Sequence, residues 1–474
     1  MTLPAKFVER VLRDLGGTEG AALCAALDAE PPVSVRLNPA KTGAETVSAG
    51  PDAGLPVPEA AGLPALAIAG RVPWSRDGRY LAVRPSFTLD PDFHAGAYYV
   101  QEASSQFVGH LLAAVRTEGA RILDLCAAPG GKTTLYASLA GPDGLVVANE
   151  IDRRRASVLA DNVRKWGTGN VAVTTCEPRA LGDFEARFDV VAVDAPCSGE
   201  GMFRKDPDAR GEWSEGNVKL CAARQDELLR EAWRALKPGG VLIYSTCTFN
   251  RDEDEGALER MAAWAGDEIA ESEETAVEDA WGIVCGRVGA FRTFRFYPHR
   301  TCGEGFFAAV ARKSFDAGGR VRAPKARRTV FAAVDRKTAG ELARWVRNPG
   351  GMRFAAVADT CYAWYAAQVD AVRTLSEALP VIYSGVALGQ VFKGVLKPDP
   401  ALAFFDGLNR GALPAAELDD EETLRFLRRQ DIAAGGLAEG MNLVCSRGRA
   451  LGFAKRIGAR VNNLYPNSLR IIKQ

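Results

Sequence analysis

The chain has 474 residues, 47% of them hydrophobic and 25% charged, which is the composition of an ordinary globular protein of about three domains. It carries 59 basic and 59 acidic residues, so its net charge points to no class of partner. The ten cysteines form no Cys-x-x-Cys pair, which disfavours both a zinc ribbon and a disulfide framework.

The sequence also bears on location and partners. Residues 1–6 contain no apolar signal core, and no apolar run approaches membrane-spanning length. Together with the free thiols, this predicts a soluble cytoplasmic protein without membrane contact or metal. Basic residues gather in 320–347 and 440–474, and acidic ones in 253–279. The basic segments fit a polyanionic partner, and equally they fit solvated surface faces.

The first part of the chain is mixed. Hydrophobic residues recur at helical spacing from Pro4 to Leu27, and a short strand at 34–39 ends at a proline. A loop rich in glycine, proline and alanine is expected from Thr42 to Gly62. Ser104 or Ser105 can cap a helix over 106–115.

From Arg121 onward, apolar runs alternate with helical patterns. Strands are expected at 122–126, 145–151, 171–176, 188–193, 241–246, 291–296 and 306–311. Helices are expected from Thr133, over 153–166 and over 225–236. This alternation predicts an α/β fold with a mostly parallel, doubly wound sheet.

The last third is less regular. Residues 313–328 are rich in glycine and basic residues, and we interpret them as a linker. Residues 330–369 have mixed helical character, whereas 382–395 alternate as strands do. From 442 onward, short apolar runs predict a small β module.

A glycine-rich loop lies between the first strand of the alternating region and its helix. The candidate ligand-binding residues in it are Cys126, Ala127, Ala128, Pro129, Gly130, Gly131 and Lys132. Glycines let a ligand approach the backbone, and a helix N-terminus favours an anionic or carboxylate group. A P-loop is excluded because its first glycine would fall at Cys126, and the Gly-x-Gly-x-x-Gly dinucleotide motif is absent.

Acidic residues end the next strands of the series. They are Glu150, Glu177 and Asp194. Acids at such positions can accept hydrogen bonds from ribose hydroxyls and from an adenine amino group. The loop and the acids together predict an adenosine cofactor without phosphates, which is S-adenosylmethionine. The alternative is that these acids only cap helices.

Two cysteines also follow strands at the edge where such sheets bind ligands. Cys197 comes after the strand that ends at Asp194, and Cys247 after the strand 241–246. These strands are neighbours in a doubly wound sheet, so we expect both thiols to flank one cleft. A thiolate that attacks carbon 6 of a pyrimidine enables carbon 5 to accept a methyl group, and Asp194 is placed to stabilise the adduct. The alternative is a buried cysteine acting as a small hydrophobe, which fits Cys247 poorly because polar residues follow at once.

These motifs resemble the Nol/Nop/Sun family of RNA cytosine carbon-5 methyltransferases. The resemblance rests on Asp124–Thr133, Asp194–Lys205, Ser245–Cys247, Arg36–Pro39, Tyr99–Gln106, Gly452–Lys455 and Asn463–Arg470. It covers nearly the whole chain and is weak between Asp316 and Leu379.

The resemblance implies roles for individual residues. Cys247 matches the nucleophile, Cys197 the cysteine that aids product release, and Asp194 the acid that contacts the target base and the cofactor. The loop 126–132, with Glu150 and Glu177, matches the cofactor site. The family usually has Asp at position 177, and the longer Glu makes this contact the least secure.

The resemblance also implies a class I methyltransferase built from several domains. We expect an N-terminal RNA-binding region at 1–97, a catalytic domain at 98–313, an intermediate domain at 329–389 and a PUA-like RNA-binding domain at 390–474. The implied substrate is 16S ribosomal RNA, free or within the small subunit, with transfer RNA as the alternative. A monomer is expected. A non-catalytic ribosome assembly factor and a protein or small-molecule methyltransferase remain open, although the two cysteines disfavour both.

Overall fold

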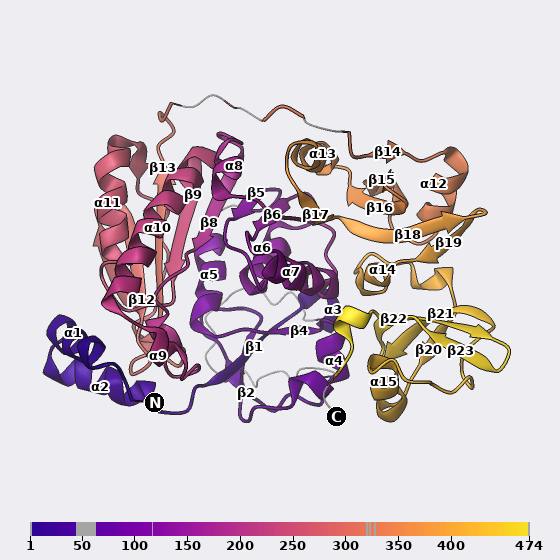
Figure 1. The fold of residues 1–474 in the computed structure, drawn as a ribbon, viewed down its shortest axis with the longest axis horizontal. Helices are drawn as coiled ribbons and strands as arrows, with labels where there is room; N and C mark the ends of the chain where they lie inside the picture. The colour runs from indigo at the N-terminus through magenta and orange to yellow at the C-terminus, as the bar shows by residue number, and fades with distance from the viewer. Residues whose placement is uncertain are drawn as a thin grey trace.

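The computed structural model describes residues 2–43, 63–115, 117–318, 321, 324–326 and 329–472. The loop expected at 42–62 lies almost wholly outside these residues, as do parts of the linker expected at 313–328. Figure 1 shows a central sheet between helices, with the N-terminal elements below it and two further units on the right.

The central sheet has ten strands, in the order β11-β12-β13-β9-β8-β5-β6-β7-β17, with β10 paired to β13. Its parallel strands are β5 (Arg121–Asp124), β6 (Leu145–Asn149), β7 (Val171–Thr174), β8 (Phe188–Asp194) and β9 (Leu236–Thr246). The antiparallel strands are β10 (Ile269–Ala270), β11 (Val284–Val288), β12 (Phe291–Phe296), β13 (Phe306–Lys313) and β17 (Val381–Ser384). The predicted doubly wound α/β fold is therefore confirmed, although only half of the strands in this sheet are parallel, because antiparallel strands extend it at both edges.

Helices cover both faces of this sheet. One face packs on α5 (Phe107–Ala113), α6 (Gly131–Ala140) and α7 (Arg153–Trp166). The other packs on α8 (Pro178–Gly182), α10 (Glu215–Ala235), α11 (Glu255–Ala265) and α13 (Val369–Ala378). Because both faces are covered, the central residues of the parallel strands are apolar and buried. Helix α10 begins earlier than the predicted 225, because Ser214 caps it by accepting a hydrogen bond from the Asn217 amide.

The N-terminal region contains a helical hairpin and a small sheet. The helix expected over 4–27 is two helices, α1 (Ala5–Leu15) and α2 (Gly17–Leu27), because Gly16 between them has a φ of 82°. The sheet has the order β2 (Ile68–Arg71), β3 (Gly78–Leu81), β1 (Val33–Leu37), β4 (Tyr98–Val100), and its helices are α3 (Pro39–Thr42) and α4 (Pro91–His94). Since β4 pairs with β1, this sheet extends past the boundary expected at 97.

A second sheet follows the central one in the chain. Its elements are β14 (Ala332–Ala333), α12 (Arg336–Ala343), β15 (Met352–Val357), β16 (Thr360–Tyr365), β18 (Val386–Phe392) and β19 (Val395–Pro398). The mixed helical character predicted for 330–369 is wrong over β15 and β16. These alanine-containing segments pair with each other as a hairpin, and that pairing overrides local propensity. The boundary expected between 389 and 390 falls inside β18.

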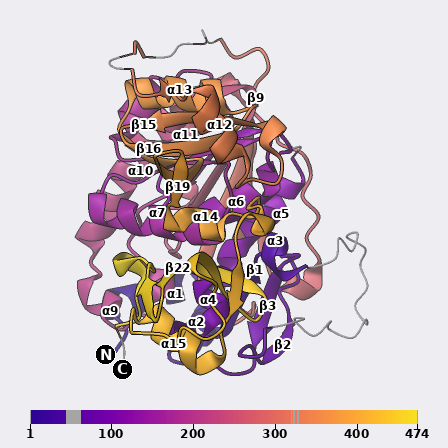
Figure 2. The same cartoon turned by 90° about the vertical axis from the view of Figure 1, so that its right-hand side faces the viewer.

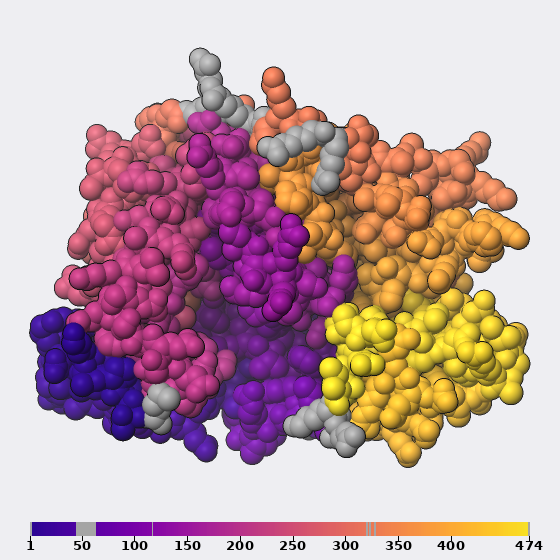
Figure 3. All heavy atoms as spheres, viewed as in Figure 1, coloured from indigo at the N-terminus to yellow at the C-terminus, as the bar shows by residue number. Residues whose placement is uncertain are grey.

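The last module is a β sheet, as predicted. It contains β20 (Ala415–Glu417), β21 (Gly440–Ser446), β22 (Arg449–Ile457), β23 (Arg460–Asn463) and the helix α15 (Asp420–Leu427), and it follows α14 (Pro400–Phe404). Figure 2 shows it below the second sheet, and Figure 3 shows it lying against the rest of the molecule. In the described part of the chain, no helix is both long and apolar enough to cross a membrane.

One short helix lies on the path between β8 and β9, the two strands that precede the cysteines. After β8 the chain forms α9 (Ala209–Glu212) before α10 begins. The side chains of Phe7 and Leu23 from the hairpin pack with Phe203, Trp213 and Phe249 from the loops after β8 and β9. The N-terminal hairpin is thus attached directly to the carboxyl edge of the central sheet.

Candidate active site

The glycine-rich loop 126–132 joins the carboxyl end of β5 to the first turn of α6, as predicted. Gly130 has a φ of 111°, and a Cβ there would lie 3.0 Å from Leu159, so glycine is favoured on both counts. The helix begins at Gly131, and its first amides lack partners within the helix. This loop therefore offers main-chain donors to a polar ligand at the sheet edge.

Asp124, the last residue of β5, lies beneath this loop. The Thr133 hydroxyl donates to its Oδ2 at 2.6 Å, while its buried Oδ1 has no hydrogen-bond partner among the described residues. Burial raises the pKa of Asp124 to about 7. A buried acceptor without a partner fits a site that is completed by a ligand.

Arg36 of β1 holds the beginning of α6 from the N-terminal sheet. Its Nη2 donates to the Gly131 carbonyl at 3.0 Å and to Thr134 Oγ1 at 2.6 Å, and its Nε donates to Gln101 Oε1 at 2.8 Å. The guanidinium also lies 4.4 Å from the ring centroid of Trp166. Burial lowers the pKa of Arg36 only to about 10, so it stays charged at neutral pH.

The two other predicted cofactor acids differ in their surroundings. The side chain of Glu150, just after β6, is only 4% exposed; it accepts from the Asp152 amide at 3.0 Å and pairs with Arg155 at 3.3 Å. Glu177 is exposed, lies beyond the end of β7, and makes no capping hydrogen bond to α8. Glu150 is therefore held in one place at the sheet edge, whereas Glu177 is not.

Asp194 ends β8 and forms an ion pair with the last residue of the loop. Its Oδ2 lies 2.7 Å from Lys132 Nζ, and its Oδ1 accepts from the Ser245 hydroxyl at 2.8 Å. Burial lowers the pKa of Lys132, but the carboxylates of Asp194 and Asp124 raise it by more, so the net pKa is raised. The Asp194 side chain is 36% exposed and is therefore open to a ligand.

The two predicted cysteines meet at the ends of neighbouring strands. Strands β8 and β9 pair in parallel, and the Sγ atoms of Cys197 and Cys247 are 3.1 Å apart. The Cys247 amide also lies 3.3 Å from Cys197 Sγ. The hydrogen bond with Cys247, together with burial, raises the pKa of Cys197 well above its ordinary value. Cys197 is therefore a neutral thiol at physiological pH.

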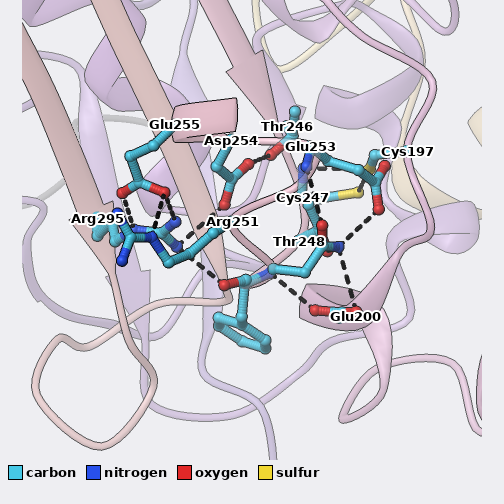
Figure 4. A network of polar contacts seen from close by, with 12 residues as sticks. Cys197, Glu200, Thr246, Cys247, Thr248, Arg251, Glu253, Asp254, Glu255 and Arg295 are labelled. Carbon is cyan, nitrogen blue, oxygen red and sulfur yellow. Dashed lines mark hydrogen bonds and ion pairs between the residues drawn. The ribbon is translucent and has the colours of Figure 1, made fainter. Parts of the chain in front are cut away.

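A buried carboxylate ties the two cysteine loops together (Figure 4). Glu253 Oε2 accepts from the Ser198 amide and from Gln225 Nε2, both at 2.9 Å, and its Oε1 accepts from Asn250 Nδ2 at 2.6 Å. Ser198 follows Cys197 directly, and Asn250 lies in the loop after Cys247. Glu253 thus fixes the position of one loop relative to the other.

A second buried carboxylate links the site to the N-terminal hairpin. Glu200, with a fully buried side chain, accepts from the Phe249 amide at 3.1 Å and from Trp213 Nε1 at 2.9 Å. It also forms an ion pair with Arg10 of α1. The loops that carry both cysteines are therefore connected to the first helix of the chain.

Sequence reasoning gave no role to three of these residues. Arg36 appeared only in a matching motif, Glu253 only in an acidic segment, and Glu200 only in the stretch that follows Asp194. Only Arg36 had a signal in the sequence that could have marked it, because it is a charged residue within the apolar strand Val33–Leu37. Among the described residues no group of His, Cys, Asp and Glu is arranged to hold a metal ion.

Comparisons with known proteins match most of the chain. The model of the N-terminal domain of 16S rRNA methyltransferase RsmF matches residues 3–103. The model of 16S rRNA methyltransferase RsmB/F matches residues 111–312, and that of the methyltransferase RsmF PUA domain matches residues 414–471.

Individual proteins agree with these family models. Ribosomal RNA small subunit methyltransferase F of Shewanella loihica is 32% identical, over 84% of this chain and 83% of its own. The protein of the same name from Enterobacter sp. is 31% identical over the same shares. A solved methyltransferase homologue from Pyrococcus horikoshii is 27% identical with a TM-score of 0.53, covering 65% of this chain and 94% of its own.

The doubly wound sheet, its glycine-rich loop and the acids at its carboxyl edge define a class I S-adenosylmethionine-dependent methyltransferase. Within that class, the chain belongs to the ribosomal RNA small subunit methyltransferase F family. The resemblance seen in the sequence motifs is thereby confirmed, and the last module is a PUA domain.

Proposed function

We propose that this protein methylates carbon 5 of cytosine in 16S ribosomal RNA and does so through a covalent bond to Cys247. The observation that supports this most strongly is the pair of thiols, whose sulfur atoms are 3.1 Å apart. They follow the paired strands β8 and β9, and Asp194 is the last residue of β8. Transfer of a methyl group to oxygen or nitrogen needs no such pair, whereas transfer to a pyrimidine carbon needs a nucleophile.

The cofactor site in this proposal consists of residues at the carboxyl edge of the sheet. The loop 126–132 would hold the methionine part, Glu150 would accept hydrogen bonds from the ribose, Glu177 would contact the adenine, and Asp194 would lie at the reacting end. When bound, S-adenosylmethionine supplies the methyl group. The unpartnered Oδ1 of Asp124 and the free amides of α6 fit such a polar ligand. The contact from Glu177 is the weakest, because this side chain is exposed and unfixed.

Residues of the protein then activate the cytosine ring and release the product. The thiolate of Cys247 bonds to carbon 6, and the electron pair of the carbon 5–carbon 6 double bond makes carbon 5 nucleophilic. After carbon 5 is methylated, a base removes its proton, the double bond re-forms, and the carbon–sulfur bond breaks. Cys197 assists this release, and Asp194 contacts the target base.

RNA binding follows from the reaction, since a base must leave its stack to reach the two cysteines. In this proposal the N-terminal region 1–97 and the PUA domain both bind the RNA beside the catalytic domain. The protein works in the cytoplasm as a monomer, on free RNA or on the small ribosomal subunit.

A bisulfite map of ribosomal and transfer RNA tests the substrate, in cells with and without the gene for this protein. The proposal predicts that the deletion removes one or a few 5-methylcytosines from 16S ribosomal RNA. Loss confined to transfer RNA would keep the chemistry and replace the substrate. A complete map without any lost mark would contradict the proposed activity.

A further inference from the structure

A cavity of about 370 Å³ lies between the N-terminal sheet region, the second sheet unit and the PUA domain. None of the candidate active-site residues lines it. Its charged lining residues are Lys41 from α3, Arg347, Asp406, Arg410 and Arg449. Four of these five side chains are basic, which sets this cavity apart from the evenly charged chain as a whole.

Two arginines stand at the exposed side of this cavity. The Arg347 guanidinium donates to the main-chain carbonyl of Asp406. Arg410 donates to the Gly448 carbonyl at 3.0 Å and lies 3.1 Å from Cys445 Sγ. Neither guanidinium has a carboxylate of the described chain within 4.0 Å. Both are thus fixed in direction by neutral partners, and their charge remains available to an anion.

Lys41 lies deeper in the same cavity. Its Nζ donates to the carbonyls of Ala95 at 2.8 Å and Lys165 at 2.6 Å, which again are neutral partners. Burial lowers the pKa of Lys41 to about 7, with Asp406 acting in the opposite direction. Burial raises the pKa of Asp406, while the charges of Lys41 and Arg347 act to lower it.

Arg449 completes the lining and differs from the other basic residues. It forms an ion pair with the buried Asp92 at 2.8 Å, so its charge is already balanced. It is therefore a structural tie between the PUA domain and α4, and we exclude it from the set that binds a ligand.

We propose that this cavity binds a phosphodiester group of the RNA substrate, with Arg347 and Arg410 as its charged contacts. The inference rests on the proposed function, because RNA is the polyanion that this enzyme handles. Arginine forks match phosphate oxygens in geometry and charge. Because Arg347 comes from the second sheet unit and Arg410 directly precedes the PUA domain, a phosphate held here would add to the RNA contacts of that domain.

The test compares two double variants of the full-length protein. Arg347→Gln/Arg410→Gln removes the two proposed contacts but keeps hydrogen-bonding side chains. The control, Arg344→Gln/Arg353→Gln, removes two exposed charges from the same sheet unit outside the cavity. Affinity for a 16S ribosomal RNA fragment is measured over a series of salt concentrations, with methylation of that fragment and melting temperature recorded for each protein.

We expect the cavity variant to bind RNA about tenfold more weakly, with a salt slope smaller by about 1, while the control stays close to wild type. Equal affinities and slopes for both variants would overturn the inference. The inference would also be overturned if inorganic phosphate raised the melting temperature of wild type but not of the cavity variant, while both bound RNA with the same affinity. The cavity would then bind free phosphate and not RNA. Failure of the wild-type protein to methylate any RNA would instead contradict the proposed function, and the two failures are thus distinguishable.

Discussion

Glu253 connects the two cysteine loops through hydrogen bonds that all end on its carboxylate. In a Glu253→Gln variant, one acceptor oxygen is replaced by an NH2 group that faces other donors. We expect a loss of about 1–3 kcal/mol in the free energy of unfolding, because buried donors lose their acceptor. We also expect kcat to fall more than the affinity for S-adenosylmethionine, since Glu253 positions the cysteines and lies outside the cofactor loop.

Denaturant unfolding and steady-state kinetics measure both effects of the Glu253 variant. The matched control is Glu259→Gln on the exposed face of α11, which should leave stability and rate unchanged. If Glu253→Gln behaved like this control, the carboxylate would have no positioning role.

Asp124 gives the stability of the ligand-free protein a defined pH dependence. Burial raises its pKa from 3.8 to about 7, so the folded state binds the proton more tightly than the unfolded state. The stability that protonated Asp124 contributes is fully present below pH 3.8 and is lost as the pH rises through about 7. Unfolding free energies across this window should therefore fall more steeply for wild type than for Asp124→Asn. Parallel curves for the two proteins would contradict the assignment.

At the scale of single residues, the sequence reveals those functional residues that directly follow predictable strands. Asp194, Cys197 and Cys247 could be placed together because the order of strands in a doubly wound sheet is known. The roles of Arg36 and Glu253 could not be predicted. Their hydrogen-bond partners are distant in sequence or are residues that no sequence motif marks. Glu177 was predicted from its place in the series, yet the strand ends earlier and leaves it exposed.

At the scale of elements, helix α1 is attached to the active site by a buried ion pair as well as by the packing of Phe7. Arg10 is the cation that faces the fully buried carboxylate of Glu200. In Arg10→Met the carboxylate keeps its Phe249 and Trp213 donors but loses its charge partner, and we expect a loss of about 1.5–3 kcal/mol in stability. Hydrogen exchange should rise in α1 and in the loops 198–202 and 247–250. Faster exchange confined to α1 would show that the hairpin does not support the cysteine loops.

The elements that could be predicted are those with a strong local pattern. Helix α7 matches its predicted range because Asp152 caps its beginning and Gly167 follows its end. The break at Gly16 was missed because the apolar periodicity continues across it. The strands β15 and β16 were missed because tertiary pairing, and no local signal, decides their conformation.

At the scale of the whole molecule, the catalytic sheet includes a strand from the segment beyond the linker. Strand β17 pairs with β7, and α13 packs its Val372 and Leu375 on one face of the central sheet. A protein truncated at residue 318 would expose the β7 edge and this apolar face. Each buried side chain of this kind contributes about 1.5–3 kcal/mol. We expect the truncated protein to melt at a clearly lower temperature and to aggregate, and an unchanged melting temperature would contradict this account.

The domain order could be read from the sequence, but the way the domains interlock could not. The predicted border at 389 assumes that each sheet is built from one continuous segment. In the structure β17 lies within the second sheet's segment but pairs with β7 of the central sheet, whereas β4 only moves the first border past residue 97. Composition and periodicity do not predict that a strand pairs with a sheet from a distant segment, because a strand needs only an apolar face to fit either sheet.

The most direct test of the central claim is to trap the covalent intermediate with labelled 16S ribosomal RNA on a denaturing gel. We expect Cys197→Ala to accumulate a protein–RNA adduct, mass spectrometry to locate the bond at Cys247, and Cys247→Ala to form no adduct and no 5-methylcytosine. Near-normal turnover by Cys247→Ala, or an adduct located at another residue, would contradict it.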